Sequence, residues 1–320
     1  MTSVMQLLDL TTPWCVHVAI TLRIADRVQA GTSNVTELAR EAECDPTFLR
    51  RVLRHLVAKG VFDEPAPGEF ALNDTAEQLL DEGLKLSSDL DGLGGRFAHS
   101  WGTLLEAVRT GKPAYAERFG RPFWEDLDAN PKLRHAFDAL MGTVGHGTPD
   151  PRLTDWETVR TVVDVGGGTG GLLAEILKAA PHLHGTLVDL PQTVAESEAL
   201  FEAAGVADRV TAVAQSFFDE LPAGSDCYVL ASILNDWPDE EVVAILRRCA
   251  AAMNDDGRVL IRGGVSPDEH AADQLTLEAV LLGGRNRSLD EFRQFALDAG
   301  LEVAKTRESP YVVELRKPTT

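Results

Sequence analysis

Cationic side chains are scarce in this sequence. Its 320 residues include 30 Lys and Arg against 50 Asp and Glu, which gives a formal net charge of −20. Nucleic-acid backbones and anionic membrane surfaces are bound through clustered Lys and Arg, so this charge balance argues against both kinds of partner. Small neutral or cationic ligands are compatible with it. The length is sufficient for two domains, each with a full hydrophobic core.

Cysteine is also scarce, and long apolar runs are absent. The four cysteines show no CxxC spacing, which excludes a zinc knuckle or a disulfide framework and favours a reducing cytoplasm. His182 and His184 form an HxH pair with no third ligand nearby in sequence, so we expect no metal site. No apolar run approaches the roughly 18 residues that a membrane span needs, and no signal peptide is evident at the N-terminus.

The first 95 residues are typical of a winged-helix module. The expected elements are two helices over residues 4–30 separated at Pro13, helices at 36–40 and 46–59, and a hairpin with strands at 61–62 and 70–72. Such modules often bind DNA through a basic helix, which Arg50, Arg51, Arg54 and Lys59 would resemble. However, residues 1–95 contain 8 basic and 15 acidic side chains. We therefore expect a dimerisation domain and not a DNA-binding one.

Residues 96–150 are predicted to form a helical layer that connects two domains and roofs a ligand pocket, since apolar and aromatic walls are typical of small-molecule sites. Aromatic side chains at helical spacing also commonly belong to the core. His99, His135 and His146 lie in this layer and are candidate bases, although for each one a structural or surface role is the more common case.

From residue 151 to residue 320, strands and helices alternate, which predicts a doubly wound α/β domain of the Rossmann type. The expected strands lie at 162–165, 185–188, 210–213, 226–231 and 258–262. The run VVDVGGGTGG at 162–171 follows the pattern of a strand, a glycine-rich turn and a helix. Asp189 in LVDLP, 23 residues after Gly166, stands at the tip of the next strand, where a carboxylate can accept hydrogen bonds from a ribose diol.

The position of Asp164 favours one class of nucleotide cofactor over another. It lies within the strand, two residues before Gly166. A carboxylate repels a pyrophosphate and attracts an ammonium group, so this arrangement favours a cofactor with a cationic amino-acid end over a nicotinamide dinucleotide. S-adenosylmethionine (SAM) fits that description. A glycine triplet after a strand also occurs as a simple tight turn in α/β proteins, and the following strand with its Asp makes that alternative weaker.

Several further motifs occur in a recognisable order. They are RPFWEDLDANPKLRHAFDALM at 121–141, QSFFDELP at 215–222, ILNDWPDEE at 233–241 and GGRNRS at 283–288 before LDEFRQFALDAGL. Together with the winged-helix start and the glycine loop, they make nearly the whole chain resemble the class I SAM-dependent O-methyltransferases of the plant caffeate and bacterial antibiotic-tailoring types. The anthracycline-tailoring members look most similar. The resemblance implies a homodimer that modifies an aromatic or polyketide-type metabolite.

The resemblance also implies site residues. Gly166 and Gly168 would approach the methionine part of the cofactor, and Asp189 with Leu190 would hold the ribose and border the adenine. Ser216 and Phe217 stand where the family has Asp followed by Met or Phe beside the adenine. Ala231 replaces a cofactor-contacting Lys or Ser, and Trp237 would wall the cofactor pocket. The implied substrate-binding residues are Trp101, Phe137, Met141, Asn235, Asn286 and Arg287.

The chain departs from the family at the chemical centre. The family pattern LHDW supplies a histidine base, whereas this sequence reads LNDW and has Asn235 at that position. In the family motif GxERT a glutamate orients the histidine, and this sequence has Asn286 in place of that glutamate. An amide does not accept a proton near neutrality. Asp236 is the acid that remains beside Asn235, either in catalysis or as a helix cap. Arg285 and Arg287 either face a substrate carbonyl or pair with Asp290 or Glu291 on a surface loop.

Three interpretations are compatible with these departures. The first is methyl transfer by proximity, in which the site holds an acidic or amide-polarised hydroxyl in line with the sulfonium methyl. The second is a repurposed scaffold that binds SAM and performs hydroxylation, decarboxylation or cyclisation. The third is a noncatalytic SAM-binding protein. The first is favoured, because orientation alone can supply about 7 to 11 kcal/mol of barrier reduction. Loss of the general base forgoes a factor of about 10² to 10⁴ in rate, which a hydroxyl of low pKa can tolerate.

Overall fold

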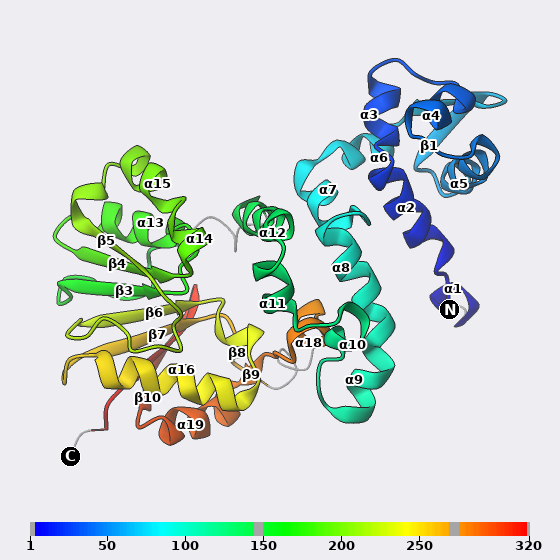
Figure 1. Ribbon diagram of the computed structural model, residues 1–320. Helices are drawn as coiled ribbons and strands as arrows, with labels where there is room; N and C mark the ends of the chain where they lie inside the picture. Colours follow the sequence, from blue (N-terminus) through cyan, green and yellow to red (C-terminus); the bar gives the residue numbers. More distant parts are fainter. Residues whose placement is uncertain (1–3, 144–149, 269–274, 319–320) are drawn as a thin grey trace. The chain divides into compact units, whose positions relative to one another are not determined.

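The computed structural model describes residues 4–143, 150–268 and 275–318 (Figure 1). The chain divides into two compact units. Unit 1 consists of Met1–Gly102 and Leu127–Val144, and unit 2 consists of Thr103–Asp126 and Gly145–Thr320. The division at residues 95 and 150 that the sequence suggests stays a prediction, and the two units are described separately below.

Unit 1 is formed by short helices and one small sheet. Its elements are α1 (Val4–Leu7), α2 (Thr11–Thr21), α3 (Ile24–Gln29), α4 (Val35–Glu41), α5 (Pro46–Ala58), β1 (Phe62–Ala66), β2 (Glu69–Leu72), α6 (Asp74–Glu77), η1 (Gln78–Leu80), α7 (Glu82–Ser88), α8 (Leu93–Ser100) and α12 (Pro131–Thr143), with η2 (Trp101–Thr103) at its edge. Strands β1 and β2 pair antiparallel with Phe62 opposite Leu72, which confirms the predicted hairpin. Apolar side chains from α4, α5 and the hairpin form its core.

Helix α5 begins as its sequence indicates. The Oδ1 atom of Asp45 accepts a hydrogen bond of 2.8 Å from the backbone N–H of Phe48, and Pro46 occupies the first turn, where its missing N–H costs nothing. The prediction for residues 4–30 was wrong in one respect. Pro13 is the third residue of α2 and does not separate two helices. Three helices occur in place of two, because the chain breaks both between Leu7 and Thr11 and near Arg23, whose backbone is left-handed with φ of 52°.

Unit 2 contains a seven-stranded sheet covered by helices on both faces (Figure 1). Its strands are β3 (Thr161–Val165), β4 (His184–Asp189), β5 (Val210–Ala214), β6 (Cys227–Ala231), β7 (Arg258–Arg262), β10 (Glu302–Glu308) and β11 (Tyr311–Arg316), and a separate short pair joins β8 (Val265–Ser266) to β9 (Arg287–Ser288). Its helices are α9 (Leu104–Thr110), α10 (Tyr115–Phe119), α11 (Phe123–Asp128), α13 (Gly171–Ala179), α14 (Pro191–Val194), α15 (Ser197–Ala204), η3 (Ala207–Arg209), η4 (Leu234–Asp236), α16 (Asp239–Ala252), α18 (Leu277–Leu282) and α19 (Leu289–Asp298). The doubly wound α/β fold class is confirmed.

The strand order locates the ligand-binding edge of this sheet. The order is β10-β11-β7-β6-β3-β4-β5, and β3 through β7 run parallel. The chain proceeds outward from β3 to β5 and then returns to the other side of β3 as β6. This creates a topological switch point between β3 and β6, and ligands bind beyond the carboxyl ends of strands at such a point.

The last two strands were not predicted individually. Strands β10 and β11 form an antiparallel hairpin at the sheet edge, and β11 also pairs antiparallel with β7. Most residues of β10 are exposed, so its sequence shows none of the apolar enrichment of the buried parallel strands. The five predicted strands all occur, with ends that agree to within one residue.

Gly170 should be essential for stability, whereas its neighbour Gly171 should not. Gly170 has φ of +90°, and a Cβ placed there would lie 2.2 Å from the Phe201 ring. Gly171 begins α13, and a Cβ there would meet nothing within 4 Å. We expect Gly170→Ala to lower the free energy of unfolding by about 2 to 4 kcal/mol and Gly171→Ala to change it by less than about 1 kcal/mol. Denaturant unfolding of both variants checks this, and equal effects would contradict it.

Candidate functional site

A glycine-rich loop connects β3 to α13 at the switch point of unit 2. Gly166 and Gly168 have φ of +69° and +63°, a backbone conformation that disfavours residues with a Cβ. The N–H of Gly166 donates a 2.8 Å hydrogen bond to the carbonyl of Val188, which ties the loop to the end of β4. A Cβ on Gly166 would lie 2.6 Å from Ile233. The loop is therefore held tightly, and its glycines leave the backbone accessible to a ligand without an intervening side chain.

The carboxylate of Asp189 stabilises this loop from the end of β4. Its Oδ2 accepts a 2.8 Å hydrogen bond from the N–H of Gly168, and its Oδ1 accepts one of 2.7 Å from the N–H of Leu190. A carboxylate oxygen can accept more than one hydrogen bond, so these bonds are compatible with a contact to a ribose hydroxyl. Asp189 thus stabilises the glycine loop, in addition to its predicted contact with a ligand.

Asp164 lies beneath the glycine loop and is almost completely buried, with 1% of its surface exposed. Neither carboxyl oxygen has a hydrogen-bond partner of good geometry among the described residues. Burial and the nearby charge of Asp189 raise the pKa of Asp164 to about 7, and the backbone N–H of Leu173 offsets this rise in part. A Cβ on Gly167 would lie 2.5 Å from this carboxyl group. The site therefore contains a buried acid that a cationic ligand would satisfy.

Aromatic side chains gather at the carboxyl ends of β5 and β6. Trp237 meets the ring of Phe217 edge-on with 5.8 Å between centroids, and it meets Phe218 in the same way at 4.9 Å. Trp237 also stacks on Trp124, with 6.3 Å between the ring centroids. These rings form an apolar wall of the kind that borders planar ligands.

Ser216 and Ala231 lie at the ends of β5 and β6. The hydroxyl of Ser216 accepts a hydrogen bond of 3.2 Å from the N–H of Phe218 and so shapes the turn before the aromatic wall. Ala231 is half-buried at the end of β6 and carries no polar side-chain atom. Both residues are at the ligand-binding edge of the sheet, and their contacts with a cofactor stay predictions.

Asn235 and Asp236 lie on the 3-10 turn η4, which Gly264 and Gly284 approach closely. A Cβ on Gly264 would lie 2.7 Å from the Asn235 nitrogen, and a Cβ on Gly284 would lie 2.0 Å from its carbonyl oxygen. The Nδ2 of Asn235 donates a 2.9 Å hydrogen bond to Oδ1 of Asp236. The Oδ1 of Asn235 is buried and has no partner among the described residues. The turn therefore presents one unused acceptor.

Asp236 does not cap a helix. The N-cap position of α16 is Pro238, and no side chain caps that helix. Burial and the negative charge of Glu278 on α18 raise the pKa of Asp236 to about 7. Asn286 is half-buried, and no hydrogen bond joins its side chain to that of Asn235 in the described part of the chain. The carboxyl partner of Asn235 is thus Asp236.

Arg287 requires a correction. Its side chain is 0% exposed, and all five of its N–H groups donate within the protein. The acceptors are Oδ1 of Asp239, which takes two of these hydrogen bonds, and the carbonyls of Leu234, Trp237 and Arg285. No donor remains for a substrate, so the predicted substrate contact of Arg287 is wrong. Its neighbour Arg285 pairs with Glu291, as the surface-loop alternative predicted, and also with Asp239.

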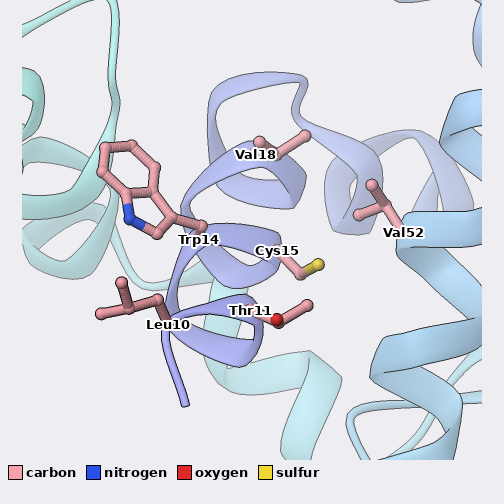
Figure 2. Close-up of a pocket in the computed structure, with 6 residues that line it drawn as sticks. All are labelled: Leu10, Thr11, Trp14, Cys15, Val18 and Val52. Atoms are coloured by element: carbon pink, nitrogen blue, oxygen red, sulfur yellow. The ribbon is translucent and has the colours of Figure 1, made fainter. Parts of the chain in front are cut away.

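Three of the predicted substrate-binding residues, Trp101, Phe137 and Met141, belong to unit 1. Trp101 is 43% exposed, and Phe137 and Met141 are half-buried on α12. Of the candidate histidines, the His99 ring lies 5.1 Å from that of Trp14, His135 is exposed, and His146 lies outside the described residues. Unit 1 also has an open apolar hollow on α2 and α5 (Figure 2), lined by Leu10, Thr11, Trp14, Cys15, Val18 and Val52. That hollow contains none of the predicted site residues.

Sequence reasoning missed several contributors to the site. Ile233 packs on the glycine loop, and Gly264 leaves room for η4. The negative charge of Glu278 on α18 raises the pKa of Asp236, and no sequence motif indicated this helix. The doublets Gly263–Gly264 and Gly283–Gly284 were a usable signal, since paired glycines often mark a close approach of two backbones.

Comparison with known proteins gives matches over both units. Residues 101–302 match the model of an O-methyltransferase domain, and residues 5–82 match that of an O-methyltransferase dimerisation domain. The 2,7-dihydroxy-5-methyl-1-naphthoate 7-O-methyltransferase of Streptomyces carzinostaticus is 41% identical over 96% of this chain and 94% of its own length. The aclacinomycin 10-hydroxylase RdmB of Streptomyces purpurascens is 39% identical over 94% of this chain and 84% of its own.

A solved structure is also similar over its full length. It is the O-methyltransferase NcsB1 from neocarzinostatin biosynthesis in complex with SAM and 2-hydroxy-5-methyl naphthoic acid. The TM-score is 0.90 at 38% identity, and the match covers 99% of each chain.

Asp164→Asn should stabilise the ligand-free protein and weaken cofactor binding. Because the folded-state pKa of Asp164 is raised to about 7 from 3.8, the folded protein binds more protons than the unfolded chain between these pH values, and its stability falls as the pH rises. At 1.36 kcal/mol per unit, the variant should gain at most about 4 kcal/mol at pH 8 relative to pH 4. Denaturant unfolding and SAM calorimetry at several pH values check this, with exposed Asp208→Asn as the control.

Arg287→Lys should destabilise the fold. A lysine cannot supply five donors in this geometry, so buried acceptors lose their partners, and we expect a loss of about 2 to 5 kcal/mol in the free energy of unfolding. The half-exposed Arg285→Lys serves as the control and should lose less. Thermal and denaturant unfolding test this. An Arg287→Lys variant of unchanged stability with a raised KM would restore the substrate-contact role.

Proposed function

Because the chain belongs to the SAM-dependent O-methyltransferase family, we propose that it transfers the SAM methyl group to a hydroxyl of an aromatic or polyketide-type secondary metabolite. Full-length matches to a hydroxynaphthoate O-methyltransferase and to a structure holding SAM with a naphthoic acid support this substrate class. The observation that carries the proposal within this chain is the buried, unpartnered carboxyl of Asp164 under the glycine loop at the sheet's switch point.

The residues at this edge of unit 2 fit SAM. We propose that Asp164 attracts its cationic methionine end, that Gly166 and Gly168 line this end with bare backbone, and that Asp189 accepts from the ribose hydroxyls. Leu190, Ser216, Phe217 and Trp237 would border the adenine and the cofactor pocket, while Ala231 offers no polar contact. SAM, when bound, supplies an electrophilic methyl group on a sulfonium.

Positioning supplies most of the catalysis in this proposal. Asn235 occupies the place of the family's histidine and does not take up a proton near neutrality. Its free Oδ1 can accept a hydrogen bond from the substrate hydroxyl and so hold the nucleophilic oxygen in line with the methyl group. The released proton passes to solvent. Phenols next to an electron-withdrawing group suit such a site, because they ionise without a strong base.

The remaining parts of the proposal concern the surroundings of this site. Trp101, Phe137, Met141 and Asn286 are proposed to contact the substrate. The dimerisation domain at residues 5–82 supports a homodimer. No helix in the described residues is long and apolar enough to cross a membrane. We place the enzyme in the cytoplasm, which is consistent with its four unpaired cysteines.

The first experiment incubates the protein with SAM and either 1,4-dihydroxy-2-naphthoic acid or 2-hydroxy-5-methyl naphthoic acid, two acids bound by a related methyltransferase. Release of S-adenosylhomocysteine together with a product heavier by one CH₂ is expected. A modified product formed without S-adenosylhomocysteine would instead identify a repurposed reaction such as that of the related hydroxylase. Cofactor binding without any turnover would leave a noncatalytic protein.

Asn235→Ala should reduce methyl transfer without abolishing it. Removal of one hydrogen bond to the reacting hydroxyl costs about 1 to 3 kcal/mol, so we expect kcat/KM to fall roughly 5- to 150-fold while SAM affinity stays unchanged. Asn235→His should retain activity and accept less acidic phenols, because it restores a base. Steady-state kinetics with a phenol series test both variants. Complete inactivity of a folded, SAM-binding Asn235→Ala protein would show that positioning alone is insufficient.

A further inference from the structure

We propose that Asp236 is a positioning residue that determines which end of the Asn235 amide faces the substrate hydroxyl. This inference rests on the proposed function and adds a regulatory element to the same site. An asparagine side chain has an accepting oxygen and a donating nitrogen at opposite ends, and rotation by half a turn exchanges them. Only the oxygen end can accept a hydrogen bond from a protonated hydroxyl.

The contacts around η4 leave the side chain of Asn235 as the movable part. Gly264 and Gly284 approach the backbone of Asn235 so closely that a Cβ on either would overlap it. Arg287 donates to the carbonyls of Leu234 and Trp237, on either side of the pair. The backbone of the turn is thus fixed, and the orientation of the amide depends on its polar partner. That partner is Asp236, at 2.9 Å from Nδ2.

The protonation state of Asp236 selects the orientation. As a carboxylate, Asp236 is an acceptor only, so it binds Nδ2 and leaves Oδ1 of Asn235 free toward the substrate. As a neutral acid, Asp236 can donate its own proton to Oδ1. The amide then turns, presents its nitrogen to the substrate, and no longer accepts from a hydroxyl. One proton taken from solvent therefore switches the site from productive to unproductive.

The electrostatic surroundings place this switch near neutral pH. Burial and the carboxylate of Glu278 raise the pKa of Asp236 to about 7. Four other charged groups lie near η4 in the described residues, the cations Arg285 and Arg287 and the anions Asp239 and Glu291, and they form ion pairs with one another. Their charges are largely compensated, so Glu278 is the neighbour whose charge sets the midpoint.

The test is the pH dependence of methyl transfer in Glu278→Gln. Loss of the neighbouring negative charge should lower the pKa of Asp236 and move the acidic limb of kcat to lower pH by about one unit. The control is Glu240→Gln, which removes the same charge from an exposed position on α16 and should leave the limb in place. The measurement uses 1,4-dihydroxy-2-naphthoic acid and a less acidic naphthol, so that a limb set by the substrate's own ionisation moves with the substrate. The proposal would be overturned if the acidic limb of kcat had the same midpoint in both variants. It would also be overturned if that midpoint changed with the pKa of the substrate.

A second measurement does not require turnover. In protein labelled with ¹⁵N-asparagine, the side-chain NH₂ signal of Asn235 should titrate near pH 7, and Glu278→Gln should lower the midpoint by the same amount as in the kinetics. Asp236→Asn should abolish the titration and lower kcat roughly 5- to 10-fold through loss of a fixed orientation, with SAM affinity unchanged. If the signal titrates as expected but no hydroxyarene is methylated, the positioning role stands and the proposed function fails. A signal that does not titrate would refute the positioning role.

Discussion

The buried guanidinium of Arg287 is the interaction on which the chemical centre of unit 2 depends. It joins β9 to the turn η4 and to the start of α16 through four hydrogen bonds. A buried arginine is costly to desolvate, and Asp239 compensates the charge while three carbonyls take the remaining donors. The result is a rigid turn that carries Asn235 and Asp236. Close packing of Gly264 and Gly284 against the same turn leaves little freedom for the backbone.

Two carboxyl groups, one buried and one half-buried, define the electrostatics of the same edge of the sheet. Asp164 lies under the cofactor loop and Asp236 lies on η4, and burial raises the pKa of each to about 7. Such groups cost folding free energy, which is tolerated at sites where a ligand or a reaction uses them. The first fits attraction of a cationic cofactor, and the second fits orientation of an amide. The pKa values of both carboxyl groups are thus raised by the same physical cause, which is loss of solvation without a cationic partner.

Much of the fold could be predicted because its signals are local. The buried parallel strands are short apolar runs, and Asp45 with Pro46 marks the start of α5. Pro13 gave a wrong prediction, because a proline in the first turn of a helix has the same local sequence signal as a helix break. The hairpin of β10 and β11 was missed because an exposed edge strand lacks the apolar pattern of a buried one.

The sequence by itself determined the family, the α/β fold and the place of the cofactor loop, since motifs in order and hydrophobic periodicity depend on neighbouring residues only. It also showed that the usual histidine is Asn235. Only the tertiary structure decided what surrounds that residue. In the structure the donors of Arg287 are all used within the protein, and Asp236 is the hydrogen-bond partner of the Asn235 amide. Glu278 on α18 affects the pKa of Asp236. The reason is that burial, charge coupling and saturation of hydrogen-bond donors arise between segments far apart in the chain.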